Sequence, residues 1–177
     1  MTIREFSELL KIMEKEPLTH SERFEKILMG LRTFVSDSLG VEEYEISLFI
    51  VDKSGFAHFA LPKSMQKSGF PLRKSKVTKK VFDTGAPVVT NEAAGVERYS
   101  IYEQMKDTPD KVMPIQKFMA VPLKDAEKTF GVIWINRRAE TFEKAGPGFT
   151  SADLGKALTI AETVAPYLSR LRPESMK

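Results

Sequence analysis

The sequence predicts an α+β fold with a central antiparallel sheet of about five to six strands. The N- and C-terminal helices pack on one face, and a lid of helix or loops covers a pocket on the other. Two apolar strands joined by a short charged turn occupy residues 118–137, and a second such pair occupies residues 44–61. Strands joined by hairpins are antiparallel. The strongest helical patterns lie at the two ends of the chain, so they most simply pack together on one face of the sheet.

The composition is that of a soluble globular domain. The chain has 177 residues, of which 42% are apolar and 29% charged, enough for one domain with a real core. No apolar run approaches the roughly 18 residues of a membrane span, and the N-terminus lacks a signal-peptide core. We therefore expect a cytoplasmic protein that does not enter the membrane.

Two helices are predicted before the first strand. Thr2 and Glu5 have the spacing of a capping box, and a short amphipathic helix follows and ends before Pro17. Thr19 and Glu22 repeat the capping signal. The apolar residues of the second helix recur at helical period: Phe24, Ile27, Leu28, Leu31, Phe34 and Val35. Gly40 stands where a C-terminal cap belongs.

The middle of the chain predicts a hairpin over residues 44–61, with its turn at 52–55. Residues 62–75 are polar and are predicted to form a loop. Ser75 can cap a helix that ends at Gly85, and residues 87–90 form a short strand.

Residues 91–114 show no clean period and are too long for an ordinary connection, which is typical of a lid or a binding loop. The hairpin of residues 116–137 follows, and then a loop over residues 139–149. Thr150 or Ser151 caps the last helix, which has a wide apolar stripe and is expected to bend at Pro166.

Four segments, in this order and spacing, resemble the GAF domain family. They are residues 80–89, with Gly85 and Pro87 between helix and strand, and residues 118–123, 131–137 and 149–154. The resemblance covers roughly residues 21–171. It implies a GAF/PAS-like fold and a sensory or regulatory module that binds a small molecule or mediates dimerisation, usually joined to an effector domain.

The resemblance also bears on cofactors. Bilin-binding members attach the chromophore through a cysteine, and members that reduce free methionine sulfoxide use cysteines; this chain has none, so both classes and cysteine-ligated metals are excluded. Cyclic-nucleotide-binding members carry an Asn-Lys…Phe…Asp-Glu signature, and this chain has no set of residues that matches it. Haem-sensing members need an axial histidine, and haem is not expected here. The ligand stays unidentified.

The alternation of residues along the strands predicts the floor of the pocket. Phe118 and Ala120 share one face of their strand, and Trp134 and Asn136 share one face of the next. An aromatic wall of Phe118 and Trp134 suits a flat or apolar ligand, although plain core packing is the alternative. The residues that alternate with these point to the other face of the sheet and are assigned to the core under the terminal helices: Met119, Val121, Ile133 and Ile135.

Further candidate ligand contacts lie in the lid and on the first hairpin. Arg98 suits a carboxylate or phosphate, and Tyr99 and Tyr102 can stack and donate hydrogen bonds; the alternative is a helix turn on the surface. His58 alternates with Phe56 and Ala60 and would bind an anion, a metal or a haem iron if that face lined the pocket. The alternative is an exposed or hydrogen-bonded strand histidine, and one histidine without partners is a poor metal site, so no metal is expected.

Catalysis and nucleic-acid binding find no support. The serines have no histidine at a suitable spacing, no glycine-rich phosphate loop is present, and the carboxylates are scattered. We interpret the basic cluster at residues 73–80 as a solvated helix face rather than a nucleic-acid-binding surface, since no aromatic residues interleave with it.

The preferred hypothesis is a non-enzymatic sensory domain that acts as a homodimer and signals through its terminal helices to an effector such as an HD-type phosphohydrolase, a cyclase or a kinase. The alternatives are a ligand-free dimerisation module and, third, a small enzyme. We divide the chain into an N-terminal amphipathic helix (1–17), a GAF-like domain (18–172) and a tail (173–177) that could begin a linker.

Overall fold

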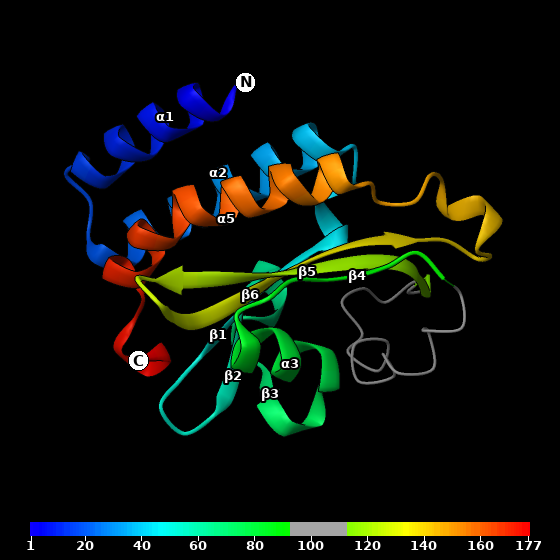
Figure 1. The fold of residues 1–177 in the computed structure, drawn as a ribbon. Helices are drawn as coiled ribbons and strands as arrows, with labels where there is room; N and C mark the ends of the chain where they lie inside the picture. The colour runs from blue at the N-terminus through cyan, green and yellow to red at the C-terminus, as the bar shows by residue number, and fades with distance from the viewer. Residues whose placement is uncertain (93–112) are drawn as a thin grey trace.

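The computed structural model describes residues 1–92 and 113–177, which form a six-stranded sheet with helices on both faces (Figure 1). One face carries α1 (Ile3–Lys15), α2 (His20–Leu39) and α5 (Ser151–Leu171). The opposite face carries α3 (Lys76–Thr84). This arrangement confirms the predicted α+β class. The predicted lid falls almost wholly on residues 93–112, which lie outside the described residues.

Every neighbouring pair of strands in the sheet is antiparallel. The strands are β1 (Ile46–Val51), β2 (Phe56–Leu61), β3 (Gly69–Pro71), β4 (Val88–Thr90), β5 (Ile115–Asp125) and β6 (Lys128–Arg138). Their order across the sheet is β3-β2-β1-β6-β5-β4, so both long strands of the second hairpin are interior strands.

Two sequence predictions were wrong in detail. Residues 62–75 are not all loop, because β3 lies within them and pairs with β2 through Ala57 and Phe70. Three residues are too few to show an alternating pattern. The first strand begins at Ile46 rather than at Tyr44, since residues 43–45 form a short 3₁₀ helix.

The helix ends follow the capping signals. Thr2 and Glu5 form the predicted capping box, as do Thr19 and Glu22. At α5 the cap is Thr150 rather than Ser151. Gly40 ends α2 with φ +59°, a conformation that a side chain disfavours. No helix within residues 1–92 or 113–177 is long and apolar enough to cross a membrane.

The larger core lies between the sheet and the terminal helices. From the central hairpin it takes the four residues assigned to it by alternation, Met119, Val121, Ile133 and Ile135. The N-terminal helix belongs to this core, because Phe6 is fully buried and stacks on Phe34 with ring centroids 4.3 Å apart. The C-terminal tail also contributes to this core, since Met176 is only 7% exposed and belongs to it.

Gly131 marks a close approach of two central strands. A Cβ atom at this position would lie 2.5 Å from the backbone oxygen of Phe49 on β1. The glycine therefore lets β6 lie against β1, which is a packing requirement rather than a matter of turn flexibility.

Candidate functional site

The face of the sheet opposite the terminal helices carries a second apolar cluster. Phe118 and Ala120 of β5 and Trp134 of β6 belong to it, together with Val81 of α3. Each of the three strand residues is at most 1% exposed. The structure thus brings three of the predicted floor residues together on the predicted side of the sheet.

An aromatic pair forms the centre of this face. The rings of Phe118 and Trp134 stack, with centroids 4.6 Å apart and planes inclined by 19°. Offset stacking of this kind favours a fixed orientation of both rings. Both rings are only 1% exposed and belong to the second apolar cluster, which is the core packing of the alternative interpretation.

Trp134 is held by a hydrogen bond as well. Its Nε1 donates to Oγ1 of Thr78 at 3.1 Å, and the hydroxyl of Ser75 donates to the same oxygen at 2.7 Å. Thr78 is fully buried, and Ser75 is the N-cap of α3. The indole is therefore fixed to the start of α3, a long-range contact that the sequence analysis missed.

Asn136 lies beside the aromatic pair. It is the cross-strand partner of Phe118 and is two residues from Trp134, so the three side chains share one face. Asn136 is fully buried, yet neither its Oδ1 nor its Nδ2 has a hydrogen-bond partner among the described residues. A buried amide left in this state costs about 1–3 kcal/mol for each unmet group.

Two small hydroxyl residues border the same face. Ser47 of β1 pairs with Trp134 and is 3% exposed, and Thr90 of β4 pairs with Phe118 and is half-buried. The described rim of the face is thus polar but uncharged next to the aromatic pair. Neither residue was singled out from the sequence, because their position depends on strand register.

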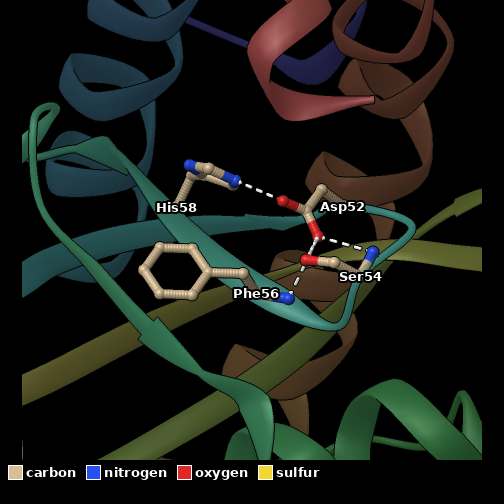
Figure 2. Close-up of polar contacts among 4 residues, drawn as sticks. All are labelled: Asp52, Ser54, Phe56 and His58. Carbon is tan, nitrogen blue, oxygen red and sulfur yellow. Dashed lines mark hydrogen bonds and ion pairs between the residues drawn. The ribbon is translucent and has the colours of Figure 1, made fainter.

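The structure does not bring His58 to this face. His58 pairs with Ile50, which belongs to the core under the terminal helices, so its side chain lies on the opposite side of the sheet. There its Nε2 lies 2.7 Å from Oδ2 of Asp52 (Figure 2). This is the hydrogen-bonded strand histidine of the alternative interpretation.

Asp52 organises the turn between β1 and β2 (Figure 2). Its Oδ1 accepts hydrogen bonds from the backbone N and the hydroxyl of Ser54 and from the backbone N of Phe56. Partial burial acts to raise the pKa of Asp52, but the bonds from Ser54, His58 and Phe56 outweigh it and hold this pKa well below its usual range. Because the Ser54 hydroxyl bonds to the carboxylate rather than to His58, these residues are not arranged as a nucleophile with its base.

The remaining predicted contacts, Arg98, Tyr99 and Tyr102, lie outside the described residues. Within residues 1–92 and 113–177, no three His, Asp or Glu side chains gather to hold a metal ion.

A model of the GAF domain matches residues 23–168, most of the chain. The chain belongs to the GAF domain family. No curated protein matched the sequence. The matched range leaves out α1, although α1 contributes to the core of this GAF domain.

Solved structures support the same fold. The GAF domain of a phosphoenolpyruvate-protein phosphotransferase from Coxiella burnetii has a TM-score of 0.66 at 15% identity, covering 96% of this chain and 94% of that one. The GAF domain of the Acinetobacter phosphoenolpyruvate-protein phosphotransferase has a TM-score of 0.64 at 14% identity, over 95% and 90%.

An enzyme shares the fold too. The type II free methionine-R-sulfoxide reductase of Thermoplasma acidophilum has a TM-score of 0.61 at 12% identity, over 86% of this chain and 97% of that one. At identities of 12–15% the likeness to these structures concerns the fold alone.

Proposed function

We propose that this GAF domain is the sensory part of a cytoplasmic signalling protein and binds a small ligand on the face formed by Phe118, Ala120, Trp134 and Asn136. The observation that carries the proposal is the buried, unpartnered amide of Asn136 beside the stacked pair. A flat apolar wall with a few convergent polar groups is the usual character of a small-molecule site. In this proposal Arg98, Tyr99 and Tyr102 of the predicted lid supply contacts from above.

Ligand binding acts by population shift. The ligand favours a conformation with residues 91–114 closed over the sheet, and closure tilts the terminal helices against those of a second copy. Support comes from Asn91, which follows β4 and is hydrogen-bonded to the residue before the cap of α5. The homodimer passes this change to an effector domain.

A thermal-shift screen against nucleotides, amino acids, organic acids and haem tests ligand binding. A ligand present at a hundred times its dissociation constant stabilises the folded state by about 2.7 kcal/mol. A hit should lose its effect in Asn136→Leu and keep it in Ile12→Ala, whose side chain is 61% exposed on α1. Spin labels on α2 and α5, read with and without the hit, then test the movement of the helices. An unchanged separation would contradict the signalling step.

A second candidate is a ligand-free dimerisation module. It is favoured by the saturation of the Trp134 indole, which already donates to Thr78 and stacks on Phe118. If the screen finds no stabilising compound and the protein is nevertheless a dimer by analytical ultracentrifugation, this candidate replaces the first.

A further inference from the structure

We infer that a cleft at the turn end of the sheet binds a small phosphate-bearing anion, held between the β1–β2 turn, the β5–β6 turn and the segment that follows α5. The cleft lies at the end of the central hairpin that is away from Asn136, so it is separate from the face discussed above. Binding in this cleft does not depend on the proposed function.

Three segments that are distant in the sequence enclose the cleft, whose volume is about 370 Å³. They lie within residues 51–55, 125–130 and 172–177, and Phe82 of α3 completes the lining. The third segment leaves the end of α5 and runs down beside the sheet (Figure 1). A cavity of this volume has room for a small ligand.

The lining of the cleft is rich in positive charge. It has four cationic side chains against two carboxylates: Lys53, Lys128, Arg172 and Lys177 against Asp52 and Asp125. Both carboxylates already accept hydrogen bonds, Asp52 within its own turn and Asp125 from the hydroxyl of Ser169. The rings of Phe82 and Phe130 supply apolar walls, and such walls strengthen the field of the charges between them. The cleft therefore attracts an anion.

Arg172 is the side chain best placed to bind the anion. Its guanidinium stacks over the ring of Phe130, with Cζ 5.4 Å from the ring centroid. Among the described residues this guanidinium makes no hydrogen bond and no ion pair; its Nε is buried, whereas its Nη atoms are not. The fork of N–H donors on an arginine matches the oxygens of a phosphate group. Stacking thus holds the guanidinium in place while its donors stay available to a ligand.

A carboxylate of the tail shows that several of these cations converge. The hydrogen bond from Lys177 and, to a smaller extent, the charges of Lys53 and Arg172 lower the pKa of Glu174. The side chain of Glu174 is 86% exposed, and an exposed ion pair of this kind is weak. An anion with more than one charge should therefore displace Glu174 from these cations.

The spread of the cations over separate segments favours phosphate chemistry. Lys128 belongs to the β5–β6 hairpin and forms no ion pair within residues 1–92 and 113–177, whereas Arg172 follows α5. An anion whose charge is distributed over several oxygens meets more of these donors than a single carboxylate does. A bound phosphate or diphosphate group would tie the segment after α5 to the two turns.

Inorganic pyrophosphate is the probe, and isothermal titration calorimetry at constant ionic strength measures its affinity. Sodium chloride at the same ionic strength is the reference. Arg172→Gln should weaken binding at least about tenfold, since it removes hydrogen bonds to a charged group. Lys128→Gln should weaken it about threefold or more. Lys67→Gln is the matched control, because Lys67 is exposed, carries the same charge and does not line the cleft.

No saturable binding of pyrophosphate would overturn the inference. Equal losses in Lys67→Gln and in the two cleft variants would also overturn it, because net charge alone would then explain the binding. Glu174→Gln gives the opposite test: it removes the competing carboxylate and should tighten binding about threefold. An unchanged or weaker affinity in this variant would contradict the shared position of Glu174 and the anion. Lys128 and Glu174 are exposed, so their variants still decide if Arg172→Gln fails to fold by circular dichroism.

Two further arms identify the source of the phosphate group. ADP represents a soluble diphosphate, and vesicles containing phosphatidic acid represent a lipid headgroup. Whichever of the two is displaced by pyrophosphate, and is bound less well by Arg172→Gln, shares the cleft. Asn136→Leu should leave the affinity for pyrophosphate unchanged, which separates this cleft from the site of the proposed function. A loss of pyrophosphate binding in a folded Asn136→Leu would place the anion elsewhere and reject the cleft.

Discussion

Asn91 and Phe149 lie 58 residues apart in the chain and are joined by two hydrogen bonds. The Nδ2 of Asn91 donates to the backbone oxygen of Phe149 at 2.8 Å, and the backbone N of Phe149 donates to Oδ1 of Asn91 at 2.8 Å. Asn91 directly follows β4, and Phe149 directly precedes Thr150, the cap of α5. One side chain thereby ties the edge of the sheet to the start of the C-terminal helix.

Asn91→Ala should destabilise the domain by about 1–3 kcal/mol, because two part-buried backbone groups of Phe149 lose their partners. Urea denaturation measures the change. Glu92→Ala is the matched control, since Glu92 is the exposed next residue and should change stability by less than about 0.5 kcal/mol. Equal effects of the two substitutions would contradict a role for the pair of bonds.

Gly148→Ala should act through the same pair of bonds. A Cβ at this position would lie 3.0 Å from Cγ of Asn91, so it pushes on the amide that binds Phe149. We expect the alanine to destabilise the natural domain by about 1 kcal/mol and to have a smaller effect in an Asn91→Ala background, because neighbouring substitutions are not additive. A double-mutant cycle measures this; strict additivity would show that Gly148 acts elsewhere.

Gly131→Ala should destabilise the domain by about 1–3 kcal/mol or more, because its Cβ would meet the backbone oxygen of Phe49 at 2.5 Å. The control is Gly155→Ala in α5, where an added Cβ meets no atom within 4 Å. This second substitution should stabilise by about 0.4–1 kcal/mol through the unfolded chain. Thermal unfolding of both variants provides the comparison, and a tolerated Gly131→Ala would mean that β1 and β6 can separate locally.

The division of the central hairpin into two faces could be predicted from the sequence. β5 and β6 are 11 residues each, long enough for the period of two to assign Met119 to one core and Trp134 to the other. Alternation does not hold at the end of β2, because an irregularity of register between Leu48 and Phe49 puts Leu61 on the same side as Ala60. A bulge of this kind leaves no mark in the sequence.

The polar groups of the site depend on contacts that are distant in the chain. Trp134 and Thr78 are 56 residues apart, and no local pattern links them. The side of the sheet on which His58 lies is set by its pairing with Ile50, which strand alternation alone does not reveal. The sequence therefore predicts which strands carry the site, while pairing between strands decides which polar side chains reach it.

The free energy of unfolding of the domain should depend on pH through Asp52. Its folded-state pKa lies below that of the unfolded chain, so its contribution is fully present above the unfolded value of about 4 and is lost as the pH falls through the lower, folded value. Asp52→Asn should destabilise the domain by about 1–3 kcal/mol at pH 7, and the difference from the natural protein should shrink below about pH 4. Urea denaturation at several pH values measures both proteins. A difference that stays constant down to acidic pH would sink this assignment.

Phe6→Ala tests whether the N-terminal helix is part of the folded unit, since it lies outside residues 23–168 that match the family. Phe6 is fully buried and stacks on Phe34 of α2, so its removal should destabilise the domain by about 3–5 kcal/mol. Ile12→Ala on the exposed side of α1 should change stability by less than about 0.5 kcal/mol. Both are measured by chemical denaturation followed through Trp134, which lies on the far side of the sheet and so reports unfolding of the whole domain. If Phe6→Ala is as mild as the control, α1 folds separately from the sheet.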